Sequence, residues 1–124
     1  MATKGKIVID TNAYEGELSP IITDAGFDVI HIPPGDYSLG DAELLQKYAQ
    51  GRWQALTMDT SMFENNPQKG AKGFIIHPDV APDEMDAYKL KLSRFLKEHT
   101  NKTLSGYVWK VPVEGEISKE DLTR

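Results

Sequence analysis

Residues 6–10 read Lys-Ile-Val-Ile-Asp, a short apolar run that stops at an aspartate, and this stretch constrains the fold most. The run predicts a buried strand over Lys6–Ile9 that ends at Asp10. Two further runs of similar length lie at Trp53–Met58 and Lys72–His77, and Asp59 directly follows the first of them. Short apolar runs without alternation are typical of strands covered on both faces of a parallel sheet.

Helices are expected between these strands. Ser19-Pro20 predicts the start of the first helix, because Ser caps helices and Pro suits the first helical position. Gly26 predicts its end, and a further strand is expected over Phe27–Ile32. Ser38 and Asp41 have the spacing of a capping box, which predicts the start of a second helix.

The longest helix is expected to open at Asp79–Asp83, and its apolar residues recur three or four apart. This stripe comprises Met85, Tyr88, Leu92, Phe95, Leu96 and His99. A last strand is expected over Ser105–Val113, at an edge of the sheet because Pro112 has no N–H to donate. The alternation of strands and helices predicts an α/β fold with about five mostly parallel strands and helices on both faces.

Composition indicates one globular domain that spans residues 1–124. We expect an ordered core over about residues 6–113 and a frayed, charged tail over residues 114–124. Hydrophobic residues make up 40% of the chain and charged residues 27%, and no cysteine is present, which excludes a disulfide scaffold, a zinc ribbon and a thiol nucleophile. No membrane-spanning or signal segment is recognisable, so a cytoplasmic location is expected.

Carboxylates are expected to gather at one edge of the sheet. Asp10 and Asp59 follow strands, and Asp41 and Glu43 lie in the first turn of the second helix. The carboxyl ends of parallel strands share one edge, and an all-oxygen site of this kind suits Mg²⁺ or Mn²⁺. The structural alternative is that these residues only cap helices and form turns. The formal net charge of −5 argues against strong non-specific nucleic-acid binding.

Several motifs in this order resemble the PIN-like domain family, and in particular its short members of the Mut7-C type, relatives of the VapC-type toxins. Six motifs carry the resemblance. The first three are a strand running into Asp-Thr-Asn (residues 7–12), a Leu-Ser-Pro helix start (18–20) and a Gly-x-Asp-Val strand (26–29). The other three are an Asp-x-Glu helix start (41–45), a strand ending in Thr-x-Asp before a Phe (57–59 with Phe63) and a Gly-led apolar strand (73–76). The resemblance covers roughly Lys6 to Val113.

Membership would imply a three-layer PIN-like fold and the chemistry of a metal-dependent ribonuclease, a hydrolase that uses Mg²⁺ or Mn²⁺. The acidic residues of the family correspond to Asp10, Glu43 and Asp59, which would be both catalytic residues and metal ligands, with Asp41 as an additional ligand candidate. The weaker substrate-binding candidates beside these acids are Asn12, Thr57, Thr60 and Ser61.

Two functional hypotheses remain open. The first is a ribonuclease, often the toxin of a toxin–antitoxin pair in this family, whose partners would be RNA, an antitoxin protein and, as a homodimer, a second copy. The second is a non-catalytic PIN-like protein that binds a protein or a nucleic acid. The three retained acids favour the first hypothesis. The second Asp of the family's Thr-Asn-Asp-x-Asp-Phe stretch is absent here, where Thr60, Ser61 and Met62 stand, and this favours the second.

Overall fold

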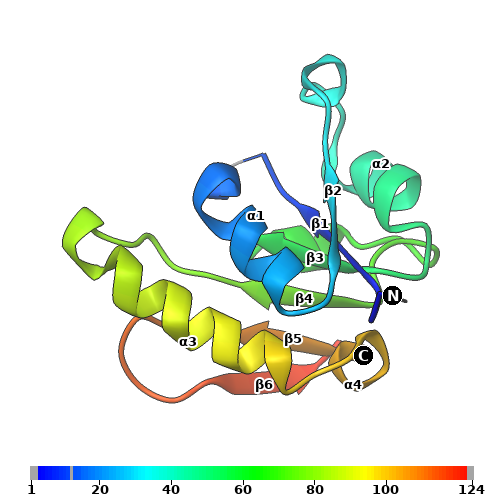
Figure 1. Ribbon diagram of the computed structural model, residues 1–124. Coiled ribbons are helices and arrows are strands. Elements are labelled where there is room, and N and C mark those ends of the chain that lie inside the picture. Colours follow the sequence, from blue (N-terminus) through cyan, green and yellow to red (C-terminus); the bar gives the residue numbers. More distant parts are fainter. Residues whose placement is uncertain (1–2, 12, 123–124) are drawn as a thin grey trace.

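The computed structural model describes residues 3–11 and 13–122, which form a single six-stranded sheet in the order β2-β1-β3-β4-β5-β6 (Figure 1). The first five strands along the chain are parallel, and β6 pairs with β5 in the antiparallel sense. The α/β class and the mostly parallel sheet expected from the sequence are therefore confirmed. The strands are β1 (Lys6–Ile9), β2 (Asp28–His31), β3 (Gln54–Thr57), β4 (Gly73–Ile76), β5 (Tyr107–Lys110) and β6 (Ser118–Asp121).

Helices connect the consecutive parallel strands except β3 and β4, which are joined by a loop that contains a 3-10 turn. The helices are α1 (Glu15–Asp24), α2 (Asp41–Leu44), which continues as a π-helical turn over Leu45–Ala49, α3 (Met85–Lys97) and α4 (Asn101–Leu104). Short 3-10 turns lie at Pro34–Asp36, Met62–Asn65 and Pro82–Glu84. Within the described part of the chain, no helix has both the length and the apolar composition needed to cross a membrane.

Two hydrophobic clusters, one on each face of the sheet, make the fold three-layered. On one face, α1 and α3 pack side by side (Figure 1) and bury Ile22 and Leu92 against Ile7 and Ile75 of the sheet. On the other face, α2 and its π-helical turn bury Leu45 against Phe74. Successive strand residues point to opposite faces, so a central strand must be apolar throughout to serve both clusters.

The strand order of the sheet reverses at β1, although β1 and β3 run parallel. After β1 the chain passes to β2 on one side and then returns to β3 on the other, so β1 and β3 are neighbours with Ile9 opposite Leu56. In open parallel sheets, ligands bind beyond the carboxyl ends of the strands at such a switch point. The expected placement of Asp10 and Asp59 at the carboxyl ends of adjacent strands is confirmed.

The start of α1 differs from the sequence-based expectation. The helix begins at Glu15, and Pro20 lies inside it, on its exposed side. Pro20 removes one helical N–H. Tyr14 precedes the helix without a side-chain cap, and its hydroxyl donates to Asp79 and accepts from the Val80 N–H. A tertiary contact therefore holds the helix start, and no local sequence signal marks it.

The C-terminal segment also differs from the expectation. Ser118–Asp121 is not frayed but forms β6, so β5 lies inside the sheet and β6 forms its edge. Pro112 follows β5 and leaves the ladder intact. The Lys119 ammonium lies 4.1 Å from the centroid of the Tyr107 ring and 5.2 Å from that of Trp109, which holds β6 through cation–π contacts.

The expected capping box before α2 is absent. Gly40 precedes the helix, and no side chain caps it. Ser38 therefore does not engage Asp41 as predicted, and the Asp41 carboxylate remains available to the carboxyl edge of the sheet. The helix ends at Gln50, whose φ of 56° is left-handed.

Phe95 tests the packing of α3. The side chain is 4% exposed, and its ring meets the Trp109 ring edge-on at 5.2 Å. Phe95→Ala should lower the free energy of unfolding by about 3–5 kcal/mol, because the change removes buried contacts and leaves a cavity. Leu90→Ala on the same helix is the matched control, since Leu90 is 68% exposed; its effect should stay within about 0.5 kcal/mol. Chemical denaturation measures both values, and equal losses would contradict this packing.

Candidate functional site

Asp10 occupies the switch point directly after β1. Its backbone N–H donates to the Leu56 carbonyl of β3 at 2.9 Å, which extends the ladder by one residue. The side chain is only 7% exposed. Its Oδ1 accepts from the Thr11 N–H at 2.8 Å, and its Oδ2 accepts from the Thr57 hydroxyl at 2.5 Å. Because each carboxylate oxygen has two lone pairs, both oxygens keep the capacity to bind a cation.

Asp59 lies two residues beyond the end of β3 and is tied to the same hydroxyl. The Asp59 N–H donates to Thr57 Oγ1 at 2.9 Å. Its Oδ1 accepts from the Ser61 N–H at 2.9 Å and from the Ser61 hydroxyl at 2.6 Å, which forms a tight turn after the strand. The Thr57 hydroxyl thus fixes the Asp10 side chain and the Asp59 backbone relative to each other.

Asp41 is the third carboxylate, and it interacts electrostatically with Asp10 and Asp59. Burial raises the pKa of the Asp41 carboxyl above its ordinary value, the carboxylates of Asp10 and Asp59 raise it further, and a hydrogen bond with Asn65 partly opposes the shift. Like charges disfavour one another's ionised forms, and they do so most strongly where burial reduces screening. The carboxyl edge of β1 and β3 therefore holds mutually repelling acids.

The structure brings Asp41, and not Glu43, to Asp10 and Asp59. Residues two apart on a helix differ by about 200° around its axis, so Glu43 projects from the other side of α2. Glu43 is exposed and lines a separate hollow with Asp36, Gln46 and Lys47. The sequence motif alone could not separate these two acids, because both occupy the first turn.

The weaker substrate-binding candidates lie in different parts of the structure. Thr57 is fully buried and lies behind the acids, so its hydroxyl positions them and does not form part of the surface. Ser61 is bonded to Asp59, and Thr60 is exposed beside a hollow of about 230 Å³ that His77 and Lys110 also line. Asn12 lies outside the described residues. Asn65, beside Asp41, was not anticipated, since nothing in the Asn- and Pro-containing loop distinguishes it.

The donor set suits a hard divalent cation, but the acids are not drawn together around one. Among residues 3–11 and 13–122, no three His, Cys, Asp or Glu side chains are arranged to hold a single ion. The carboxylates of Asp10, Asp41 and Asp59 nevertheless interact electrostatically. Carboxylate oxygens are the ligands that Mg²⁺ and Mn²⁺ prefer, so the chemistry of these residues fits such an ion.

Comparisons of the whole chain with protein-family models, with curated proteins and with solved structures find no significant match.

Repulsion at the site predicts a stabilising substitution. The folded-state pKa of Asp41 is raised, so its carboxylate opposes folding at pH values above the unfolded-state pKa of about 3.9. Asp41→Asn should therefore raise the melting temperature at pH 7 in the presence of a chelator. The gain should shrink as the pH falls toward about 4, where both states become protonated.

Glu43→Gln is the control for this measurement, because it removes the same charge from the same helical turn at an exposed position. Melting curves of both variants between pH 4 and pH 8 separate the site from the helix terminus. Equal gains for the two variants would contradict the clustering of Asp41 with Asp10 and Asp59.

Proposed function

We propose that this protein is a PIN-like ribonuclease that hydrolyses RNA with Mg²⁺ or Mn²⁺. The observation that carries the proposal is that Asp10 and Asp59 follow the neighbouring strands β1 and β3 and that both interact electrostatically with Asp41, whose pKa they raise. The resemblance of the sequence motifs to the PIN-like family supports RNA as the substrate. In this proposal Asp41, already a ligand candidate from the sequence, takes the place that the family resemblance assigned to Glu43.

Each acid has a distinct task in this proposal. A bound divalent ion lowers the pKa of a water molecule and neutralises charge on the phosphate that is attacked. Asp10 is oriented by the Thr11 N–H and the Thr57 hydroxyl, which fix the position of its carboxylate. Asp59 presents a carboxylate fixed by Ser61. Asp41 would add a third carboxylate from α2.

A second candidate function is non-catalytic binding, and one observation favours it. No three acids in the described part of the chain are already arranged around a common ion, and Thr60, Ser61 and Met62 stand where the family has a further Asp. A site with fewer carboxylates binds a cation less strongly. Cleavage assays decide between the two candidates.

The assay uses single-stranded RNA with the purified protein in Mn²⁺, in Mg²⁺ and in a chelator. Cleavage should require the metal, and Asp10→Asn, Asp41→Asn and Asp59→Asn should each abolish it, because Asn retains one oxygen ligand but loses the charge. Glu43→Gln should retain activity, since its side chain lies on the other side of α2. Cleavage in the chelator, or in Asp59→Asn, would contradict this mechanism.

Metal binding also has a readout that is independent of cleavage. Excess Mn²⁺ should raise the melting temperature of the wild-type protein, because a ligand at 100 times its Kd stabilises the folded state by about 2.7 kcal/mol. The shift should be much smaller for Asp59→Asn. An equal Mn²⁺ shift in both proteins would place the ion elsewhere.

Thr57 tests the positioning of the acids. Thr57→Val keeps the shape of the side chain but removes the hydroxyl that Asp10 and the Asp59 N–H share. Metal affinity or activity should fall by about 10–100-fold, the usual effect of losing a partner behind the ligands. Thr57→Ser retains the hydroxyl and should remain close to wild type. Titration with Mn²⁺ followed by thermal melting measures the affinities, and equal affinities of the Val and Ser variants would refute this role.

A further inference from the structure

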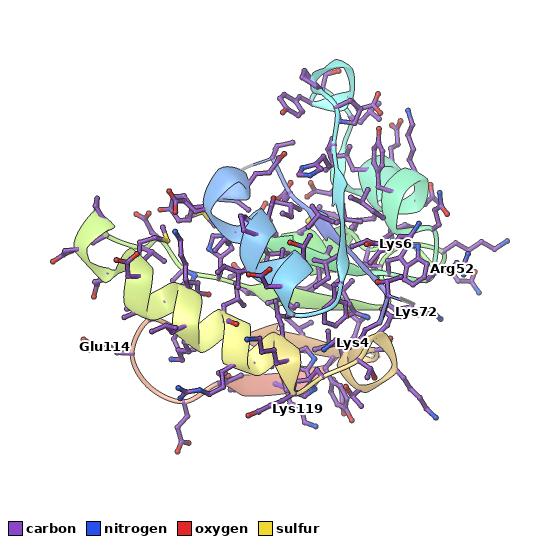
Figure 2. The ribbon with its side chains drawn as sticks, in the orientation of Figure 1. Lys4, Lys6, Arg52, Lys72, Glu114 and Lys119 are labelled. Carbon is purple, nitrogen blue, oxygen red and sulfur yellow. The ribbon has the colours of Figure 1, made fainter. Side chains whose placement is uncertain are left out.

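The opposite end of the sheet carries a group of basic residues that the proposed active site does not use. Lys6 begins β1, Arg52 and Trp53 lie just before β3, and Lys72 lies just before β4. We call these four residues the amino-end rim. Figure 2 shows Lys6, Arg52 and Lys72 gathered at the end of the sheet where the chain begins. Neighbouring strands lie about 4.8 Å apart, so β1 and β4 are separated by about 10 Å.

Trp53 lies between two cations of this rim. The Arg52 guanidinium lies 4.7 Å from the centroid of the Trp53 ring, and the Lys6 ammonium lies 5.7 Å from it. Trp53 is half-buried, whereas Arg52 is exposed. The rim therefore presents an indole and a planar guanidinium together at the surface.

The rim cations are not neutralised by direct ion pairs. In the described part of the chain, the salt bridges involve His31, Lys47, Lys89 and Lys110, and none involves a cation of the rim. Asp28 is the register partner of Lys6 on β2. Lys4 is excluded from the rim, because its ammonium donates to the Leu96 carbonyl and lies over the Phe27 ring.

Hydrogen bonds to neighbouring residues fix the backbone of the rim. The Lys72 N–H donates to the Trp53 carbonyl at 2.9 Å, and the Asn101 side chain donates to the Arg52 carbonyl at 3.0 Å. Gln54 is fully buried, and its amide nitrogen donates to Asn101 Oδ1 at 3.0 Å. Gly73 leaves room for Gln54, because a Cβ there would lie 2.2 Å from its Oε1. A fixed backbone loses little entropy when a ligand binds.

We propose that the amino-end rim binds single-stranded RNA, with phosphates on Lys6, Arg52 and Lys72 and a base stacked on the Arg52–Trp53 pair. Cations that follow the backbone, combined with an aromatic platform, are how proteins bind unpaired strands without reading their sequence. A duplex conceals its base faces, so the half-buried indole and the exposed guanidinium beside it favour a single strand. The choice of RNA rests on the proposed function, whereas the binding itself requires neither the acids nor a metal.

The test measures fluorescence anisotropy of a short 5′-fluorescein-labelled oligouridine with the full-length protein in a chelator, where metal-dependent cleavage is blocked. Arg52→Gln, Lys6→Gln and Lys72→Gln should each raise Kd. Each should also reduce the slope of log Kd against log salt concentration by about 0.7. Trp53→Leu should raise Kd about five-fold or more through lost stacking. Trp53→Phe, which keeps a ring, should lose less, and thermal melting confirms that each variant is folded.

Arg94→Gln is the matched control, because Arg94 is an exposed arginine of α3 whose loss changes the net charge by the same amount. Its Kd should equal that of the wild-type protein. Equal Kd values for Arg94→Gln and Arg52→Gln, or no binding at low salt, would overturn the proposal. Duplex RNA or anionic vesicles that compete as well as the single strand would assign the rim to a different polyanion and overturn it too.

This outcome is separable from that of the proposed function. Asp59→Asn should lose cleavage and keep the oligouridine Kd of the wild-type protein, because the acids and the rim lie at opposite ends of the strands. A protein that binds through the rim and never cleaves would refute the nuclease and leave the rim proposal standing. A protein that cleaves RNA while its rim variants bind oligouridine normally would support the nuclease and refute the rim proposal.

Discussion

The hydroxyl of Thr57 joins the ends of the two strands on which the candidate site depends. It donates to Asp10 after β1, and it accepts from the backbone of Asp59 after β3. The hydroxyl lies on β3 itself, so the parallel pairing of β1 with β3 sets its position. The geometry of the acids is therefore a consequence of strand register, and a shift of the register by one residue would turn Thr57 to the other face.

Ionisation of Asp41 is unfavourable in the folded protein. Burial and the carboxylates of Asp10 and Asp59 raise the pKa of Asp41, so its ionised form opposes folding. Asp41 is available for this interaction because no capping box forms. Gly40, which has no side chain to cap the helix, precedes α2. A protein that keeps mutually repelling carboxylates at a switch point gives up stability that a cation would restore. The nuclease proposal accounts for this arrangement.

The polarity of the sheet separates the charges of the molecule. All the parallel strands point the same way, so residues that follow them gather at one edge and residues that precede them gather at the other. Asp10 and Asp59 occupy the first edge, and Lys6 and Arg52 occupy the second. A chain with a formal net charge of −5 can therefore present a cationic surface to a polyanion, although its overall charge opposes such binding.

The sequence by itself determined the elements whose signals are local. The apolar runs predicted β1, β3 and β4, and the stripe that contains Tyr88, Leu92 and Phe95 predicted the buried face of α3. The acids after β1 and β3 followed from those strands. Local signals failed where distant contacts decide the structure. Ser19-Pro20 predicts a helix start, but α1 begins earlier, where Tyr14 contacts Asp79 and Val80. The charged segment Ser118–Asp121 pairs as β6 because β5 offers it a ladder and aromatic rings. Only the packing of α2 on the sheet brings Asp41 under the electrostatic influence of Asp10 and Asp59 and leaves Glu43 exposed, because the buried residues of a helix fix its rotation about its axis.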